Sequence, residues 1–324
     1  MKRLLRFCLR ALTTLALLAV TLALLFAWYV YTPAAPVPQL AGTLDRSSID
    51  IGGVKRSYQT YLPPSLPKGA PLVMVMHGSG GSATQIRLET GYAFERLADQ
   101  HAFALAFPNA IDGYWDACNI VGDVGANGFD DVKFLTTLVD KLVAETGVDA
   151  NRVFAVGSSR GGSMALRLAL EAPSRFRAVA AISSSVPTTD NSKCKRSAAG
   201  ASSVLIMNGT DDPLVPFDGG QVSLFGLLYK NGAVRSSRES AQYFADLDHL
   251  ASAPDVHETP LADGVRVERM LWHDGSAIEV ELAAIHGAGH GLPQPYRRRP
   301  RLLGPSPSQP NGAELIWEFF ARQR

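Results

Sequence analysis

The chain has 324 residues, of which 46% are hydrophobic and 19% are charged, and its formal net charge is +1. These values are typical of a globular protein with a sizeable core, and the near-neutral charge excludes the broad basic surface of a nucleic-acid-binding protein. A local basic cluster among prolines remains, and we interpret it as a solvated loop. It consists of Arg297, Arg298, Arg299 and Arg301.

The N-terminus carries a segment long enough to cross a membrane. Basic residues between Lys2 and Arg10 precede an uncharged apolar run from 11 to 30. About 20 helical residues span the hydrocarbon core of a bilayer, whereas the apolar part of a cleaved signal peptide is usually about 7 to 15 residues long. The run ends in aromatic residues that favour a membrane interface. Residues 1–31 are therefore predicted to be a signal anchor with a cytoplasmic basic end, or a signal peptide, and either way the rest is exported.

Export changes how the cysteines are interpreted. Cys8 lies in the basic flank and is expected to have no role. Cys118 and Cys194 would then face an oxidising compartment and are candidates for one disulfide, the alternative being two buried thiols. No Cys or His spacing typical of a metal site is present, so no metal or other cofactor is expected.

A proline-rich linker, residues 32–41, follows the apolar segment. Its prolines predict an extended spacer that lifts the following domain off the membrane. We assign 42–324 to one domain, because neither an internal repeat nor a second domain is evident.

Within this domain, short apolar runs alternate with helical patterns. The segment SIDIGGVKRSYQTYLP predicts an edge hairpin turning at Gly52-Gly53. Buried strands are predicted at 72–76 and 103–108 and near 153, 179 and 205, and a late strand pair is predicted to turn at Asp274-Gly275. Ser82 and Gln85 resemble a capping box that opens a helix carrying Phe94 and Leu97 on one face. Further helices are predicted to begin at 130–131 and to span 312–322. The alternation predicts an α/β protein with a mostly parallel central sheet and helices on both faces.

The segment GSSRGG, residues 157–162, lies between a predicted strand and a predicted helix. Gly157-x-Ser159-x-Gly161 fits the nucleophile-elbow pattern, in which small neighbours allow a strained strand-to-helix turn to expose the serine. Ser159 is therefore the candidate nucleophile. The serines at 183–185 also follow a strand but have no flanking glycines.

A serine nucleophile needs a base and a carboxylate that orients the base, in the chain order Ser, Asp, His. The loop after the strand near 205 offers Asp212, which precedes a proline and is preferred over Asp211 and Asp218. The loop after the last strand offers His290, which lies between two glycines and is preferred over His286.

Acyl transfer also requires donors for an oxyanion. The backbone amide of Arg160 is the first candidate, since it follows the nucleophile. The second donor is expected in the glycine-rich loop after 72–76, at Ser79 or next at Gly78, and His77 is expected to be structural.

At this point the chain resembles the exported α/β-hydrolases that include polyhydroxybutyrate depolymerase-like proteins of the LpqC type, feruloyl esterases and acetylxylan esterases. The resemblance covers nearly the whole domain, and it implies the α/β-hydrolase fold and the same triad of Ser159, Asp212 and His290. It runs through MHGSGGSA (76–83), DDVKFL (130–135), VDANRVFAVGSSRGGSMA (148–165), NGTDDPLVP (208–216), GAGHGLP (287–293) and AELIWEFF (313–320).

Three positions bear on the substrate. The family usually has Asn where this chain has Arg160, whose side chain could contact an acidic substrate or pair on the surface. Leu292 stands where the family usually has Trp. Trp115, in the segment GYWDACN, is a candidate for lining the acyl or alcohol pocket, with plain packing as the alternative.

The sequence therefore predicts an exported, cofactor-independent serine esterase, membrane-tethered or secreted. The substrate is expected to be a short 3-hydroxyacid oligomer or an acylated plant polysaccharide. The alternatives are a serine peptidase on the same fold and a non-catalytic surface binding protein, which would usually lack one triad member.

Overall fold

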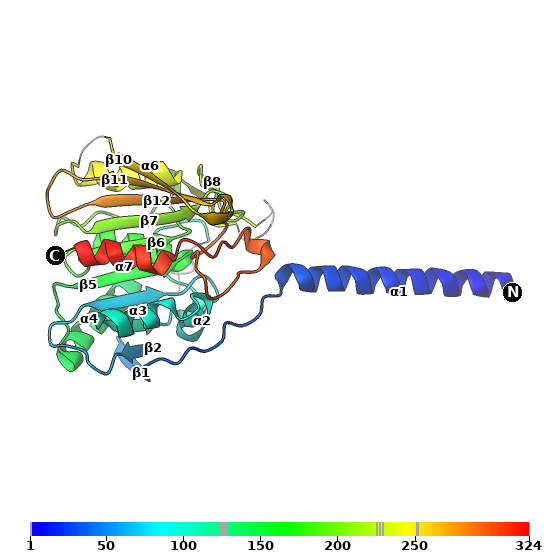
Figure 1. The fold of residues 1–324 in the computed structure, drawn as a ribbon, viewed down its shortest axis with the longest axis horizontal. Coiled ribbons are helices and arrows are strands. Elements are labelled where there is room, and N and C mark those ends of the chain that lie inside the picture. The colour runs from blue at the N-terminus through cyan, green and yellow to red at the C-terminus, as the bar shows by residue number, and fades with distance from the viewer. Residues whose placement is uncertain are drawn as a thin grey trace.

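A computed structural model describes residues 2–122, 129–224, 226, 228, 230–250 and 253–323. Helix α1 (Lys2–Val30) projects away from the rest of the protein (Figure 1). It is 29 residues long and has no buried residues, and its most apolar stretch of 18 residues has a mean hydropathy of 2.2. By length and composition it is able to cross a membrane or to serve as an export signal.

The rest of the described chain is built on a ten-stranded sheet with the order β1-β2-β4-β3-β5-β6-β7-β12-β11-β10. The strands from β4 to β12 in this order run parallel, and the strands at both edges pair antiparallel. Their bounds are β1 (Thr43–Ile51), β2 (Val54–Leu62), β3 (Leu72–Met76), β4 (Ala104–Pro108), β5 (Val153–Ser158), β6 (Ala178–Ile182), β7 (Ser203–Gly209), β10 (Asp255–Pro260), β11 (Arg266–Trp272) and β12 (Val280–His286). The predicted mostly parallel α/β sheet with an edge hairpin is confirmed.

Helices cover both faces of this sheet. Alternate residues of the central strands point to opposite sides, so each strand contributes to two core clusters. In β3, Met74 belongs to one core cluster, with helices α4 (Asp131–Thr146), α5 (Arg160–Glu171) and α6 (Ser237–Leu247). Its neighbours Val73 and Val75 belong to the opposite cluster, with α2 (Ala83–Glu89), α3 (Ala93–His101) and α7 (Gly312–Arg322). The strands are therefore buried on both faces, which explains their continuous apolar sequences.

The helix predicted after Ser82 is broken into two. Ser82 does cap α2, since its side chain accepts a hydrogen bond from the Gln85 amide at 3.2 Å. The Gln85 side chain instead donates to Glu89, so the capping box is incomplete. Gly91 and Tyr92 then adopt φ values of 61° and 58°, in the left-handed region, and this ends the first helix before the residues that α3 buries.

Several elements were not predicted. Helix α6 has a complete capping box at Ser236 and Glu239, and β10 extends the sheet beyond β11. A small separate ribbon consists of β8 (Gly220–Gln221) and β9 (Ala233–Val234). Short 3₁₀ helices are η1 (Ile111–Gly113), η3 (Thr189–Asn191), η4 (Ala262–Gly264) and η5 (Arg301–Leu303).

The linker between α1 and β1 runs along the domain (Figure 1). Ala35 is buried, and Leu40 packs against the core cluster that contains α3. The Ala41 amide donates to the Asp99 carboxylate at 2.8 Å. The linker is extended, but in this structure it is fastened to the domain and so does not act as a free spacer.

Cys118 and Cys194 form a disulfide with a Cα–Cα distance of 5.0 Å. The bond joins the segment after β4 to the segment after β6. The Lys193 amide donates to the Cys118 carbonyl at 2.9 Å beside it. Two loops at the carboxyl ends of the strands are thereby held together.

Replacing both Cys118 and Cys194 by serine is expected to lower the free energy of unfolding by about 2–4 kcal/mol, because the unfolded chain loses a cross-link. Urea denaturation of the purified, oxidised protein measures this difference. Cys8→Ser is the matched control, since Cys8 is exposed and unpaired. Equal stability of the double variant and the wild type would contradict the prediction.

Candidate active site

Ser159 lies at the turn between β5 and α5, with φ 54° and ψ −119°. A positive φ is strained for a residue with a side chain, and it is the conformation that a nucleophile elbow requires. The Ser159 amide donates to the Ile182 carbonyl at 2.8 Å, which fixes the turn against the end of β6. The predicted nucleophile therefore occupies an elbow above the sheet.

Glycines make this turn possible. A Cβ at Gly157 would lie 2.0 Å from the Gly161 carbonyl oxygen, and a Cβ at Gly161 would lie 2.5 Å from the backbone oxygens of Met76 and His77. No side chain fits at these distances. Strand β5, helix α5 and the end of β3 thus touch through backbone alone.

Asp212 and His290 come together from the loops after β7 and β12. His290 Nδ1 lies 2.8 Å from Asp212 Oδ2, and both side chains are buried. The other carboxylate oxygen, Oδ1, accepts from the amides of Leu214 and Val215 at 2.8 and 2.9 Å. The carboxylate is therefore fixed in orientation and holds one edge of the imidazole.

The rival residues lie elsewhere. His286 ends β12 and its Nε2 lies 3.0 Å from a Glu268 carboxylate oxygen. Asp211 is exposed and accepts from the Thr210 hydroxyl. Asp218 is also exposed. Among the predicted candidates for base and carboxylate, Asp212 and His290 are the pair with a described contact.

Ser183 connects the histidine loop to the elbow. Its hydroxyl accepts a hydrogen bond from the Gly291 amide at 2.5 Å, directly after His290. The preceding residue, Ile182, accepts from the Ser159 amide. Two hydrogen bonds through adjacent residues of one buried segment thus link the residue after His290 and the Ser159 amide to the same stretch of backbone. Sequence reasoning considered Ser183 only as a rival nucleophile.

The loop after β3 faces the nucleophile at Gly78. A Cβ on Gly78 would lie 3.5 Å from the Ser159 Cβ, which is ordinary contact distance. The next amides are engaged, since Gly80 donates to the Gly113 carbonyl and Gly81 to the Gly78 carbonyl. The backbone at Gly78 and Ser79 therefore lies beside the elbow, next to the N-terminus of α5, where Arg160 is the first residue.

His77 shapes this loop from behind. Its Nε2 accepts from the Ala110 amide at 3.1 Å, so Nδ1 carries the proton that bonds the Gly78 carbonyl at 2.8 Å. Burial lowers the pKa of His77, and the ring is neutral at physiological pH. The expected structural role of His77 agrees with these contacts.

Trp115 is fully buried. Its indole N–H donates to the His77 carbonyl at 2.9 Å, and its ring centroid is 5.1 Å from that of His77. The side chain therefore packs behind the Gly78 loop and does not line an open pocket, so the structure favours the packing alternative. Leu292 is likewise buried, in the core cluster with α7.

Arg160 does not pair on the surface, because its side chain is buried. Nε donates to the Trp115 carbonyl at 2.6 Å and Nη1 to Asn231 Oδ1 at 3.3 Å. Nη2 is buried without a hydrogen-bond partner. Arg160 lines a cavity of about 20 Å³ together with Ser159 and Asn119, and Asn119 Oδ1 is also buried and unpartnered.

Among the residues that the structure describes, no group of three or more His, Cys, Asp or Glu side chains is arranged to hold a metal ion.

Comparison with known proteins gives consistent matches. The family described as "Esterase PHB depolymerase" matches residues 56–222, just over half of the chain. The chain is 29% identical over 304 residues to a protein of Nocardia uniformis subsp. tsuyamanensis that is named as the esterase NocK. The match covers 90% of this chain and 86% of that protein. It is 27% identical over 225 residues to feruloyl esterase C of Emericella nidulans, covering 66% of this chain and 77% of that protein.

Two solved structures share the fold. The acetyl xylan esterase from Aspergillus awamori superposes with a TM-score of 0.60 at 17% identity, covering 87% of this chain and all of that one. The S-formylglutathione hydrolase from Agrobacterium tumefaciens superposes with a TM-score of 0.53 at 13% identity, covering 91% of this chain and all of that one. At these identities the likeness establishes the α/β-hydrolase fold alone.

Gly161→Ala is expected to destabilise the protein by at least about 1–3 kcal/mol and to displace the elbow, because the new methyl group overlaps two backbone carbonyls. Thermal unfolding combined with circular dichroism measures the loss. Gly275→Ala is the control, because a Cβ at this position has no heavy atom within 4 Å. Its only expected cost is the left-handed backbone of residue 275, which lowers the free energy of unfolding by about 1–2 kcal/mol. A Gly161→Ala protein as stable as the wild type would contradict the close backbone contact.

Proposed function

The chain belongs to the family of PHB depolymerase esterases, and on this premise we propose that it hydrolyses carboxylic esters with Ser159 as nucleophile, His290 as base and Asp212 as the residue that orients the base. The observation that carries the proposal is the 2.8 Å contact between His290 Nδ1 and a fixed, buried Asp212 carboxylate on the loops next to a strained elbow serine.

In the first step His290 removes the proton of Ser159 as the hydroxyl attacks the ester carbonyl. Nδ1 is engaged with Asp212, so Nε2 is the nitrogen that accepts this proton. The imidazolium that forms is stabilised by the Asp212 carboxylate. Two backbone amides hold that carboxylate in place, so it does not need to reorient during the reaction.

The tetrahedral intermediate carries an oxyanion, and its donors are the backbone amide of Arg160 and an amide of the loop at Ser79 or Gly78. Arg160 is the first residue of α5, where backbone amides have no partner within the helix and the helix dipole favours negative charge. Gly78 supports the second donor position because it lies in contact distance of Ser159.

Collapse of the intermediate expels the alcohol, which takes the proton from His290, and leaves an acyl group on Ser159. A water molecule then attacks the acyl-enzyme while His290 again acts as base, and the acid is released. All of these steps use side chains and backbone amides of this chain.

The same proposal includes export. Helix α1 would be retained as an anchor whose basic end stays in the cytoplasm, with the catalytic domain on the other side of the membrane. The Cys118–Cys194 disulfide supports an oxidising compartment for that domain.

The cavity next to Ser159 supports a preference among esters. Asn119 Nδ2 donates to the Asn231 carbonyl at 3.2 Å, which leaves Asn119 Oδ1 as an unpartnered acceptor, while Arg160 Nη2 is an unpartnered donor. A hydroxyl group both accepts and donates, and its oxygen fits a space that holds about one water molecule. A carboxylate or methyl group would satisfy at most one of the two atoms. The proposed substrate is therefore an ester of a short hydroxyacid.

Ser159→Ala is expected to abolish labelling by a fluorophosphonate probe and to lower kcat by about 10⁴-fold or more, because the nucleophile is lost. Gel fluorescence of the full chain reports labelling, and Ser163→Ala is the control on the same helix. If the wild type does not label, the non-catalytic binding protein becomes the better explanation. If the wild type labels but cleaves peptide amides in preference to esters, a serine peptidase becomes the better explanation.

Arg160→Met keeps an unbranched side chain and the backbone amide but removes the guanidinium donors. We expect the wild type to prefer 4-nitrophenyl 3-hydroxybutyrate over 4-nitrophenyl butyrate by about 10- to 100-fold in kcat/KM, the effect of one hydrogen bond to a charged group. The variant should lose this preference while hydrolysing the butyrate ester within a few-fold of the wild-type rate. Equal wild-type rates on the two esters would contradict the hydroxyl preference and leave the triad proposal intact.

A further inference from the structure

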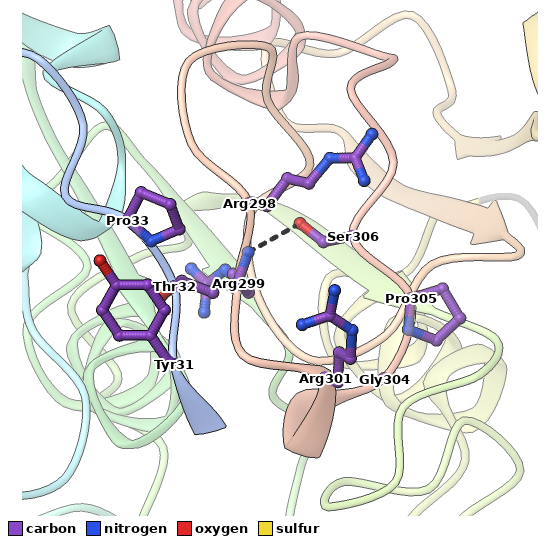
Figure 2. A pocket seen from close by; sticks show the side chains of 9 residues that line it. All are labelled: Tyr31, Thr32, Pro33, Arg298, Arg299, Arg301, Gly304, Pro305 and Ser306. Atoms are coloured by element: carbon purple, nitrogen blue, oxygen red, sulfur yellow. Dashed lines mark hydrogen bonds between the residues drawn. The ribbon is translucent and has the colours of Figure 1, made fainter. Parts of the chain in front are cut away.

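A second, larger cavity of about 390 Å³ lies where α1 ends (Figure 2). Its walls come from two distant parts of the chain, the start of the linker and the loop that follows the catalytic histidine. Figure 2 shows the linker residues on one side and Arg301 with Pro305 on the other. The lining residues are Tyr31, Thr32, Pro33, Arg298, Arg299, Arg301, Gly304, Pro305 and Ser306.

The walls of this cavity are positively charged. Three arginines line it, and the ion pairs found between described residues include none of them. Arg299 Nε and Nη2 are buried without hydrogen-bond partners. The carboxylates of Glu89 and Asp212 act on Arg299 only from a distance. The sequence predicted that this arginine cluster is a solvated loop. In the structure the cluster is instead partly buried, and three of its arginines line a cavity.

Unpaired guanidinium donors in a partly buried site are unfavourable unless water or an anion binds them, and an anion also compensates the positive charge. Burial lowers the pKa of Arg299, yet an arginine remains protonated in proteins, so the charge persists. Guanidinium groups bind phosphate oxygens through paired hydrogen bonds. The Ser306 hydroxyl already accepts from the Arg299 amide at 3.1 Å and still has a proton to donate to an anion.

The position of the cavity identifies the source of the anion. Arg301 lies over the Trp28 ring, 4.0 Å from its centroid, and donates to the Trp28 carbonyl at 2.9 Å. Trp28, Tyr29 and Tyr31 are the aromatic residues at the end of the apolar helix, and such residues lie at the headgroup level of a bilayer. When α1 spans a bilayer, a cavity beside these residues lies at the depth of the lipid phosphates.

We propose that this cavity binds the phosphate headgroup of an anionic phospholipid, whose acyl chains lie along α1 in the bilayer. Arg299 and Arg298 contact the phosphate, and Arg301 links the site to the helix through Trp28. The proposal requires α1 to be retained in the mature protein, and it is independent of the ester chemistry.

The site also adjoins the catalytic loop. The Arg299 guanidinium packs against Gly291, where a Cβ would lie 1.9 Å from its Cζ. The His290 amide donates to the Leu303 carbonyl at 2.7 Å, and the Gly289 amide to the Pro305 carbonyl at 2.7 Å. The segment that holds the backbone of His290 is therefore a wall of the lipid site.

The test uses the full chain in non-ionic detergent, with bound lipids counted by native mass spectrometry during titration. Phosphatidylglycerol is expected to bind at least about tenfold more tightly than phosphatidylcholine. Arg299→Gln and Arg298→Gln are each expected to lower the affinity for phosphatidylglycerol by about tenfold. Arg298 is exposed and forms no described ion pair, so its variant remains informative if Arg299→Gln impairs folding.

Arg297→Gln is the matched control, since it removes the same charge from the same loop but the residue does not line the cavity. It should leave the affinity within about twofold of the wild type. The proposal is overturned if phosphatidylcholine binds equally well, or if the control weakens binding as much as Arg298→Gln and Arg299→Gln. It is also overturned if equimolar inorganic phosphate displaces the lipid. A further contradicting result is an intact mass showing that protein isolated from membranes lacks α1.

Discussion

The site depends on one steric constraint, the contact of three backbone segments around Gly157 and Gly161. Strand β5, helix α5 and the end of β3 approach so closely that no Cβ fits between them. This contact places the N-terminus of α5 and the Gly78 loop on either side of Ser159. The strain in the Ser159 backbone is maintained by the surrounding sheet and helix, which together leave the turn no other conformation.

Around this contact, buried polar groups fix the other parts of the site. Asn208 donates to the Ser184 carbonyl and accepts from the Ser184 amide, which positions the segment that also contains Ser183. His77 and Trp115 hold the Gly78 loop through further buried hydrogen bonds. Each of these groups is costly to bury unless its partner is in place, so the network tolerates little displacement. The disulfide fastens the loops outside the network.

Sequence patterns predicted the central strands and the candidate triad because both depend on local signals. Buried parallel strands are continuous apolar runs, and the three loops carry characteristic small and polar residues. The break at Gly91 and Tyr92 was missed because it depends on a left-handed backbone that Tyr rarely adopts. Strand β10 has no apolar alternation and exists only because β11 pairs with it. Helix α6 had a readable signal, the Ser236 and Glu239 capping box, that was not used.

The side-chain environment of the site lay beyond sequence reasoning. Arg160 and Asn119, each with one unpartnered atom, line the same cavity because segments about 40 residues apart in the chain converge beside Ser159. Only a tertiary structure shows that Arg160 is buried and that Trp115 packs behind the loop. The arginine cluster at 297–301 is a further case, because only the structure shows that the start of the linker and these arginines line one cavity.

The wall shared by the proposed lipid cavity and the His290 loop gives α1 a structural connection to the candidate active site. The loop that holds His290 is bonded on its inner side to Ser183 and meets Trp28 and the linker on its outer side. A soluble fragment that begins at β1 would leave Arg301 without its aromatic partner and open the outer side of that loop to water. The form that keeps these contacts is therefore the chain with α1 in place.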